Sequence, residues 1–205
     1  MKPIVVALTG ASGAVYGIRL VQVLLESGRK VDLVVSDPAR LVIAEELGAP
    51  VSNPLHLESW APFLGRDLEG KLQVHSVRDF AAPIASGSYP VEAMAIVPCS
   101  MGTLGALAAG ISQNLIHRAA DCVMKENRRL VIVPRETPLS AIHLENMLKL
   151  ARLGVRVVPA MPGFYSGAKT IEEIVDFVVG KVLDQLDISH ALYPRWVGRL
   201  QEAKR

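Results

Sequence analysis

The sequence has no excess of charge of either sign and very little cysteine. Its 22 lysine and arginine residues stand against 20 aspartate and glutamate residues, a formal net charge of +2. A balance this close to neutral lacks the basic footprint of proteins that bind nucleic acid or an anionic membrane surface. The 2 cysteines, Cys99 and Cys122, are too few for a disulfide scaffold. We therefore expect reduced thiols, a cytoplasmic location, and neither nucleic acid nor a membrane as a partner.

Long hydrophobic runs are also missing. The apolar stretch after Lys2 ends at Leu8 and is followed by Thr9-Gly10, so it is too short for a signal peptide. Residues 93–116 carry no charge, but proline, glycine and polar residues interrupt them. A membrane-spanning helix needs about 20 predominantly apolar residues. Both stretches are therefore expected inside a globular fold.

Apolar residues are abundant, although few of them are aromatic. They make up 50% of the chain, whereas aromatic residues contribute only 5%, and this is enough for the core of one domain. We predict a single domain over residues 1–205, with residues from about 187 to 205 as a C-terminal extension. Because charge is sparse, we also expect another subunit to cover part of the apolar surface.

Strand and helix patterns alternate along the chain. Buried strands are predicted at residues 4–8, 31–35, 93–97, 130–133 and 155–158, with weaker candidates at 72–76 and near Phe80. Helices are predicted at residues 14–26, 36–47, 114–126, 140–153 and 170–186, with a further helix of small residues after residue 100. This alternation predicts an α/β, Rossmann-like (flavodoxin-like) parallel sheet with helices on both faces. Such sheets bind ligands beyond the carboxyl ends of their strands.

Three glycines follow the first predicted strand. Gly10, Gly13 and Gly17 have the spacing G-x-x-G-x-x-x-G, which lets backbone N–H groups at a helix start approach an anion closely. The spacing differs from the G-x-G-x-x-G of dinucleotide-binding proteins, which argues against an NAD-dependent dehydrogenase. A tight turn without any ligand explains the same glycines.

Hydroxyl groups follow the predicted strand at 93–97. The side chains of Ser100 and Thr103, with the amides of the turn, can hold a phosphate or the edge of a heterocycle without net charge. Cys99 stands beside them and has the reactivity of a nucleophile. A buried cysteine that packs as a small hydrophobic residue is more common.

Charged residues follow the strand at 130–133. Arg135 can fix a phosphate and Glu136 can transfer protons, although an ordinary surface ion pair is the alternative. We expect Thr137 to cap the next helix and Pro138 to begin it.

The helix at 114–126 places Arg118 and Lys125 on one face by its 3.6-residue period. That face is either a solvated stripe or a cationic wall facing a phosphate. Lys181 lies at the edge of another apolar stripe, where its stem can also extend along the surface towards water. The 5 histidines lack metal-ligand spacing, and His143 is expected to pack inside its helix.

Several motifs occur in a fixed order over nearly the whole chain, except at residues 48–78. They are T-G-A-S-G-A-V-Y-G-I-R-L at 9–20, A-S-G-S at 85–88, P-C-S-M-G-T-L at 98–104, N-L-I-H-R-A-A-D at 114–121, P-R-E-T-P-L-S-A-I-H-L-E-N-M-L-K-L at 134–150, P-G-F-Y at 162–165 and D-F-V-V-G-K-V-L-D at 176–184. With these motifs the chain resembles the UbiX-like flavin prenyltransferase family, whose members were formerly described as aromatic-acid decarboxylases.

The resemblance implies a reaction and its partners. Members attach a dimethylallyl group from dimethylallyl monophosphate to N5 and C6 of reduced FMN, without a metal, and UbiD-type decarboxylases use the product. Homo-dodecamers with sites at subunit interfaces are common in the family. By position, the resemblance implies that FMN contacts Gly10, Ala11, Ser12, Ser36, Ser100, Met101, Gly102, Thr103 and Arg135.

The resemblance also implies roles for charged residues. Its donor-phosphate residues are Arg118, Lys125, Arg135, Tyr165 and Lys181, and the four cations are expected to converge on one phosphate. Its catalytic residues are Ser12, Lys125, Glu136 and Tyr165, with Glu136 transferring protons.

Two positions depart from the family pattern, which often has proline at 168 and arginine at 181. Here they are Ala168 and Lys181, so the charge at 181 is kept while the bidentate geometry of arginine is lost. Two other interpretations remain. A flavin-dependent cysteine decarboxylase of similar fold would need an early catalytic histidine, and none precedes His56. A non-catalytic FMN-binding or carrier protein would need neither Lys125 nor Glu136.

Overall fold

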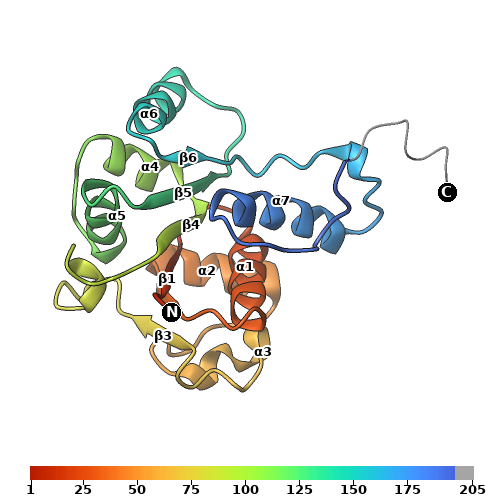
Figure 1. Cartoon of the computed structure of the whole chain (residues 1–205), viewed down its shortest axis with the longest axis horizontal. Helices are drawn as coiled ribbons and strands as arrows, with labels where there is room; N and C mark the ends of the chain where they lie inside the picture. Colours follow the sequence, from red (N-terminus) through yellow and green to blue (C-terminus); the bar gives the residue numbers. More distant parts are fainter. Residues whose placement is uncertain (197–205) are drawn as a thin grey trace.

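One parallel sheet forms the centre of the molecule in the computed structural model, which describes residues 1–196 (Figure 1). The strand order is β3-β2-β1-β4-β5-β6, and all neighbours run parallel. This is the order of a doubly wound sheet, in which the chain reverses its winding between β1 and β4. The predicted α/β, Rossmann-like class is confirmed. The strands are β1 Ile4–Leu8, β2 Val31–Val35, β3 Leu72–His75, β4 Ala93–Cys99, β5 Arg129–Pro134 and β6 Arg156–Val157.

Helices cover both faces of the sheet and divide the core in two. On one face, α1 (Ala14–Glu26), α2 (Asp37–Leu47) and α7 (Ile171–Gln185) pack against one set of strand side chains. On the other face, α4 (Met101–Ala108), α5 (Leu115–Lys125) and α6 (Ala141–Arg152) pack against the alternate set. Every residue of β1, β2 and β4 is buried, which explains why β1 and β4 read as continuous apolar runs rather than alternating ones. In β2 the run is interrupted by Asp32, whose carboxylate contacts Nε2 of His75 at 2.7 Å.

Polar caps begin the helices where the sequence places them. The hydroxyl of Ser36 accepts the N–H of Ala39 at the start of α2. At the start of α7, Thr170 and Glu173 form the predicted capping box. Since each cap satisfies an amide that has no partner within the helix, the helix starts were readable from sequence.

Two local predictions were wrong. There is no strand near Phe80, because the carboxylate of Asp79 accepts the N–H of Ala81 and closes a turn there. Short helices lie on both sides of this turn in the sequence: η1 Leu57–Trp60 and α3 Ala61–Leu64 before it, and η2 Pro83–Ala85 after it.

The start of α6 agrees with the predicted range 140–153 but not with the expected cap at Thr137. Thr137 and Pro138 do not begin the helix; Ser140 caps it instead. The hydroxyl of Ser140 accepts the N–H of His143 at 3.3 Å, and Nδ1 of His143 accepts the N–H of Ser140 at 3.2 Å. His143, expected to pack within its helix, therefore serves as one half of a capping box.

The chain leaves the sheet after β6, passes through η3 (Phe164–Ser166) and returns along α7. In Figure 1 this part extends sideways from the body of the molecule. The predicted extension from about residue 187 is described as far as Trp196, and residues 197–205 lie outside the described part. No helix among residues 1–196 is long and apolar enough to cross a membrane.

Candidate active site

The candidate site lies at the carboxyl edge of the sheet, where the connections after β1, β2, β4 and β5 meet. Thr9 joins two of these connections. Its hydroxyl donates to the carbonyl oxygen of Pro98 at 2.8 Å and accepts the N–H of Ser100 at 2.7 Å. Thr9 is 2% exposed, so both bonds are shielded from water. The sequence marks Thr9 only as a polar residue directly after a buried strand.

The first turn of α4 presents hydroxyl groups and an open backbone. The hydroxyl of Ser100 accepts the N–H of Thr103 at 3.3 Å and donates to its hydroxyl at 3.1 Å. A Cβ on Gly102 would meet no atom within 4 Å. Packing within the chain therefore does not require glycine at this place, and the lack of a side chain leaves the turn accessible to a ligand. Met101, which begins α4, is half-buried beside them.

Arg135 reaches from the end of β5 to the loop after β1. Its Nε donates to the carbonyl oxygen of Ser12 at 3.2 Å. Among residues 1–196, no ion pair or hydrogen bond engages its terminal nitrogens. Glu136 is exposed, and its carboxylate accepts the N–H of Thr137 at 2.9 Å. Arg135, Ser12 and Glu136 thus lie at the carboxyl edge of the sheet, with Arg135 reaching across the end of β4 to the loop after β1.

A carboxylate from α2 occupies the start of α1. Glu46 accepts the N–H of Gly13 at 3.0 Å and that of Ala14 at 2.9 Å. The expectation that these amides face a bound anion needs correction, since a protein carboxylate already balances the helix dipole there. Gly13 adopts φ +101, and a Cβ would stand 2.9 Å from the Tyr16 ring, so glycine is needed for the turn itself.

The loop after β1 also packs closely against the start of α2. A Cβ on Gly10 would lie 2.5 Å from Cβ of Pro38. Glycine at this position therefore leaves room for the Pro38 ring. The backbone N–H of Ser36, two residues earlier, donates to the carbonyl oxygen of Leu8 at 3.1 Å. Ala11 is buried and Ser12 is exposed. The predicted flavin contacts therefore lie on adjoining loops.

Two predicted phosphate residues lie beside one aromatic ring on the α7 face. The ring centroids of Tyr165 and Phe177 are 5.7 Å apart and nearly perpendicular, at 85°. Nζ of Lys181 stands 5.4 Å from the centroid of Phe177. Tyr165 is 65% exposed, so its hydroxyl-bearing ring is open to a ligand.

The other two helical cations lie on the opposite face, on α5. Nε of Arg118 donates to the carbonyl oxygen of Ala85 at 2.9 Å, and the guanidinium pairs with Asp121 at 2.9 Å. Lys125 is exposed at the end of α5, shortly before β5 begins at Arg129. Arg135 follows the other end of β5, about 20 Å away along the strand.

One chain therefore does not bring the four predicted cations to one phosphate. The sheet separates Arg118 and Lys125 from Lys181, and the length of β5 separates Lys125 from Arg135. Convergence of the four cations on one phosphate stays a prediction, which requires contributions from more than one copy. The 3.6-residue period indicates the helix faces that carry Arg118, Lys125 and Lys181 but not how the helices lie relative to each other.

Cys99 is buried and unsuited to attack a substrate. It is 0% exposed, and burial raises the pKa of its thiol to about 12. The thiolate is the nucleophilic form, so Cys99 packs as a small hydrophobic residue. Among residues 1–196, no group of three or more histidine, cysteine, aspartate or glutamate side chains could hold a metal ion.

Comparison with known proteins fits this geometry. Residues 1–183 match the family model described as Flavoprotein. A flavin prenyltransferase UbiX from Halalkalibacterium halodurans is 53% identical over 93% of this chain and 91% of its own. The chain belongs to the UbiX flavin prenyltransferase family. The matched residues 1–183 include the connections after β1, β4 and β5, which contain Thr9, Ser100 and Arg135.

Solved structures of UbiX proteins share the fold over nearly the full chain. AnUbiX (PadA1) in complex with FMN and dimethylallyl pyrophosphate is 41% identical, with a TM-score of 0.84 and coverage of 96% of this chain and 98% of its own. A dodecameric FMN-dependent UbiX-like decarboxylase from Escherichia coli O157:H7 is 44% identical, with a TM-score of 0.83 and coverage of 97% and 100%. An FMN-dependent cysteine decarboxylase, at 17% identity and TM-score 0.57, shares the fold alone.

Proposed function

We propose that this chain transfers a dimethylallyl group from dimethylallyl monophosphate to N5 and C6 of reduced FMN. The proposal rests on the hydrogen bonds that join three loops at the carboxyl edge of the sheet, those after β1, β4 and β5. Thr9 connects the loop after β1 to the start of α4, and Arg135 connects the end of β5 to the same loop. A planar flavin needs such a continuous edge of backbone and hydroxyl groups.

The flavin contacts proposed by position suit the chemistry of FMN. The exposed turn at Gly102 admits close approach, and the hydroxyls of Ser100 and Thr103 are neutral hydrogen-bonding groups. Arg135 has terminal nitrogens directed to no protein acceptor among residues 1–196, and a guanidinium binds phosphate well. When bound, the reduced flavin supplies the nucleophile, so the protein needs none. The full proposed set is Gly10, Ala11, Ser12, Ser36, Ser100, Met101, Gly102, Thr103 and Arg135.

We propose that the donor phosphate is bound between copies of the chain. Tyr165 and Lys181 lie on the α7 face, whereas Arg118 and Lys125 lie on the α5 face. Arg135 of one copy can meet the α7 face of a second copy and the α5 face of a third. Cations and hydroxyl donors then stabilise the negative charge that develops on the leaving phosphate without a metal.

Glu136 is the proposed proton-transfer residue. It is exposed beside Arg135 at the carboxyl edge, where the flavin is proposed to lie. Closing the new ring at C6 requires a proton to be donated to the double bond of the dimethylallyl group and the proton on C6 to be removed, and a carboxyl group can donate and accept in turn. Ser12, Lys125 and Tyr165 complete the proposed catalytic set. Ser12 orients groups at the β1 loop, and the other two act on the phosphate.

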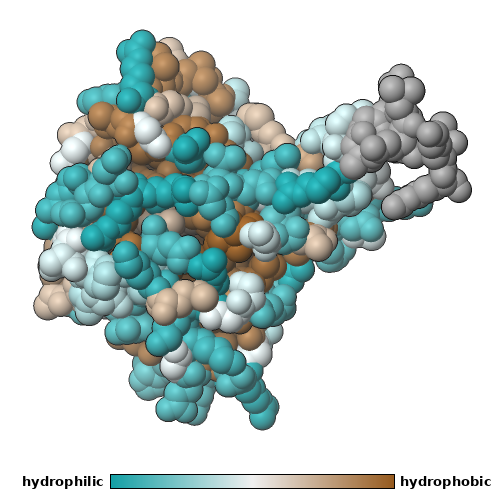
Figure 2. Space-filling model, in the orientation of Figure 1, coloured by the Kyte–Doolittle hydropathy of each residue, from teal (hydrophilic) through white to brown (hydrophobic). Residues whose placement is uncertain are grey.

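A homo-oligomer explains the surface of α6. Ile142 is 67%, Leu144 53%, Leu148 51% and Leu153 63% exposed, and Figure 2 shows hydrophobic residues gathered over this helix at the top of the molecule. Exposed apolar residues gathered on one helix mark contact sites. We propose that it is buried between copies in a homo-dodecamer. Delivery of the product to a UbiD-type decarboxylase, a cytoplasmic location and a single domain over residues 1–205 are further parts of the proposal.

The deciding experiment is an anaerobic incubation of the protein with reduced FMN and dimethylallyl monophosphate. Mass spectrometry should detect a flavin heavier by one C5 unit, with a changed absorbance spectrum. A parallel reaction with the diphosphate measures which donor is preferred. If neither donor gives an adduct while FMN still binds, the chain is a flavin carrier and the proposal fails.

A further inference from the structure

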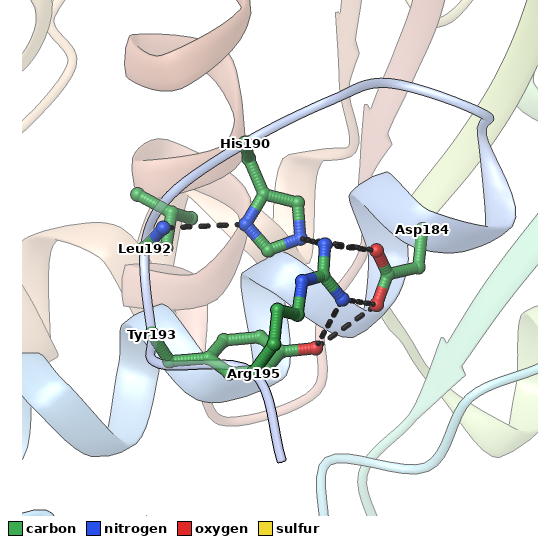
Figure 3. A network of polar contacts seen from close by, with 5 residues as sticks. All are labelled: Asp184, His190, Leu192, Tyr193 and Arg195. Carbon is green, nitrogen blue, oxygen red and sulfur yellow. Dashed lines mark hydrogen bonds and ion pairs between the residues drawn. The ribbon is translucent and has the colours of Figure 1, made fainter. Parts of the chain in front are cut away.

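The segment after α7 turns back and is fastened to that helix by one carboxylate (Figure 3). Asp184 accepts the hydroxyl hydrogen of Tyr193 at 2.9 Å and two N–H groups of Arg195 at 2.8 and 2.7 Å. Nδ1 of His190 accepts the N–H of Leu192 at 3.3 Å. The ring hydrogen therefore sits on Nε2, which donates to Asp184 at 3.2 Å. We call Asp184, His190, Tyr193 and Arg195 the Asp184 clasp.

Gly180 lets the rings of the clasp lie directly on α7. A Cβ at Gly180 would overlap the Tyr193 ring and stand 2.6 Å from Cε1 of His190. Glycine inside a helix is less stable than alanine. At position 180 this lower helix stability is accompanied by a close approach of the Tyr193 and His190 rings to α7, which any side chain larger than hydrogen would block.

The clasp places an aromatic face against Lys181. Nζ of Lys181 stands 5.3 Å from the centroid of Tyr193 and 5.4 Å from that of Phe177. The two ring centroids are 5.1 Å apart with their planes inclined by 40°. Both distances are within the range of cation–π attraction. An ammonium on a flexible stem is thereby confined between two rings.

The same segment also reaches Tyr165. The centroids of Tyr165 and Trp196 are 6.4 Å apart, at 78°, and Tyr165 shares the Phe177 ring with Lys181. Residues 187–196 therefore contact both side chains that this face offers to the donor phosphate.

We propose that Tyr193 is a positioning residue for Lys181, held in place by the Asp184 clasp, and that it sets the affinity for the donor phosphate. This inference rests on the proposed function. Lysine is a mobile point charge, whereas arginine carries a planar fork. The ring of Tyr193 limits the positions that the ammonium group of Lys181 can take, which the flexible lysine side chain does not do by itself.

The test compares Tyr193→Leu with Tyr193→Phe, using the full-length oligomer. Tyr193→Leu removes the aromatic face and should raise KM for dimethylallyl monophosphate about 3- to 30-fold, with kcat and the dissociation constant of FMN little changed. Tyr193→Phe keeps the ring and should retain most of the donor affinity. Tyr89→Leu, far from the site at the other end of the sheet, is the matched control for loss of a tyrosine. An unchanged KM in Tyr193→Leu, or an equal loss of FMN and donor affinity, overturns the proposal.

A second measurement does not depend on turnover. Acetic anhydride labelling followed by peptide mass spectrometry gives the modification rate of Lys181 in each protein. Lys181 should react faster in Tyr193→Leu and in Gly180→Ala than in the wild type, because its amine has left the two rings. Equal rates overturn the positioning role. Faster labelling in a protein that forms no flavin adduct would instead show that the positioning holds and the proposed function fails.

Discussion

The hydroxyl of Thr9 is bonded at once to the carbonyl oxygen of Pro98, at 2.8 Å, and to the N–H of Ser100, at 2.7 Å. A single buried side chain thus sets the separation between the first strand's loop and the start of α4. Any flavin contact made by both loops depends on this spacing, although Thr9 itself is too buried to touch a ligand.

Thr9→Val tests this connection. The substitution keeps the shape but leaves the Ser100 N–H without its partner, which should cost about 1–3 kcal/mol of unfolding free energy. The Pro98 carbonyl loses the hydroxyl but keeps the backbone N–H of Thr9. FMN affinity should fall as well. Urea denaturation and fluorescence titration measure the two effects. Thr137→Val, at an exposed position, is the control and should change stability by less than about 0.5 kcal/mol. Wild-type stability in Thr9→Val would refute the role.

Glu136→Gln separates binding from proton transfer. The amide keeps the size of the side chain but cannot accept a proton at neutral pH, so the protein should bind FMN normally and stop before the ring closes at C6. Mass spectrometry should detect the C5 mass gain, while absorbance should lack the spectrum of the finished product. Glu69→Gln, at an exposed position before β3, should behave as the wild type. Normal product from Glu136→Gln would assign proton transfer elsewhere.

Acid should weaken the Asp184 clasp. The hydrogen bonds from Arg195 and Tyr193, with the nearby charge of Arg195, lower the pKa of Asp184 from 3.8 to about 2 against the opposing effect of burial. A lowered folded-state pKa means that the unfolded chain binds the proton more readily. The stabilisation is therefore complete above pH 4 and is lost as the pH falls towards 2.

Asp184→Asn provides the comparison for this pH dependence. Its thermal midpoint should be lower than that of the wild type at pH 7, and the difference should shrink between pH 4 and pH 2. Differential scanning fluorimetry across that range measures both. Two profiles that run parallel throughout would show that the carboxylate contributes nothing to stability.

Cys99→Ala should retain flavin prenylation. The thiol is fully buried, and burial raises its pKa to about 12, so almost no thiolate exists at neutral pH. In the folded wild type, iodoacetamide should leave Cys99 unmodified, and it should react after unfolding in urea. Loss of adduct formation by Cys99→Ala with FMN binding intact would restore the nucleophile hypothesis.

Local chemistry made much of the fold predictable. Three helix starts are recognisable in the sequence because a hydroxyl group caps an amide only three residues away, at Ser36, Ser100 and Thr170. Apolar runs such as residues 4–8 indicate strands buried on both faces. Near Phe80 and Thr137 the same signals misled, because Asp79 and Ser140 offered the backbone a competing hydrogen-bond partner.

The site was less predictable, because its parts are joined by distant contacts. Glu46 reaches the amides of Gly13 and Ala14 from a different helix, and no local pattern marks such a carboxylate. Helical periodicity likewise indicated the faces that carry Arg118 and Lys181 but not that the sheet lies between them. Tertiary packing decides both, and a single sequence does not contain that information in local form.

The placement of cations on opposite faces of the sheet has a consequence for enzyme activity in dilute solution. If one phosphate needs Lys125 from one copy and Lys181 from another, specific activity should fall steeply once the protein is diluted below its assembly constant, in accordance with mass action. Two inactive proteins, Lys125→Ala and Lys181→Ala, should regain activity when dissociated and reassembled together. Mixed particles contain some interfaces at which every lysine is intact, so regained activity is the result expected if the catalytic site lies at the junction between copies.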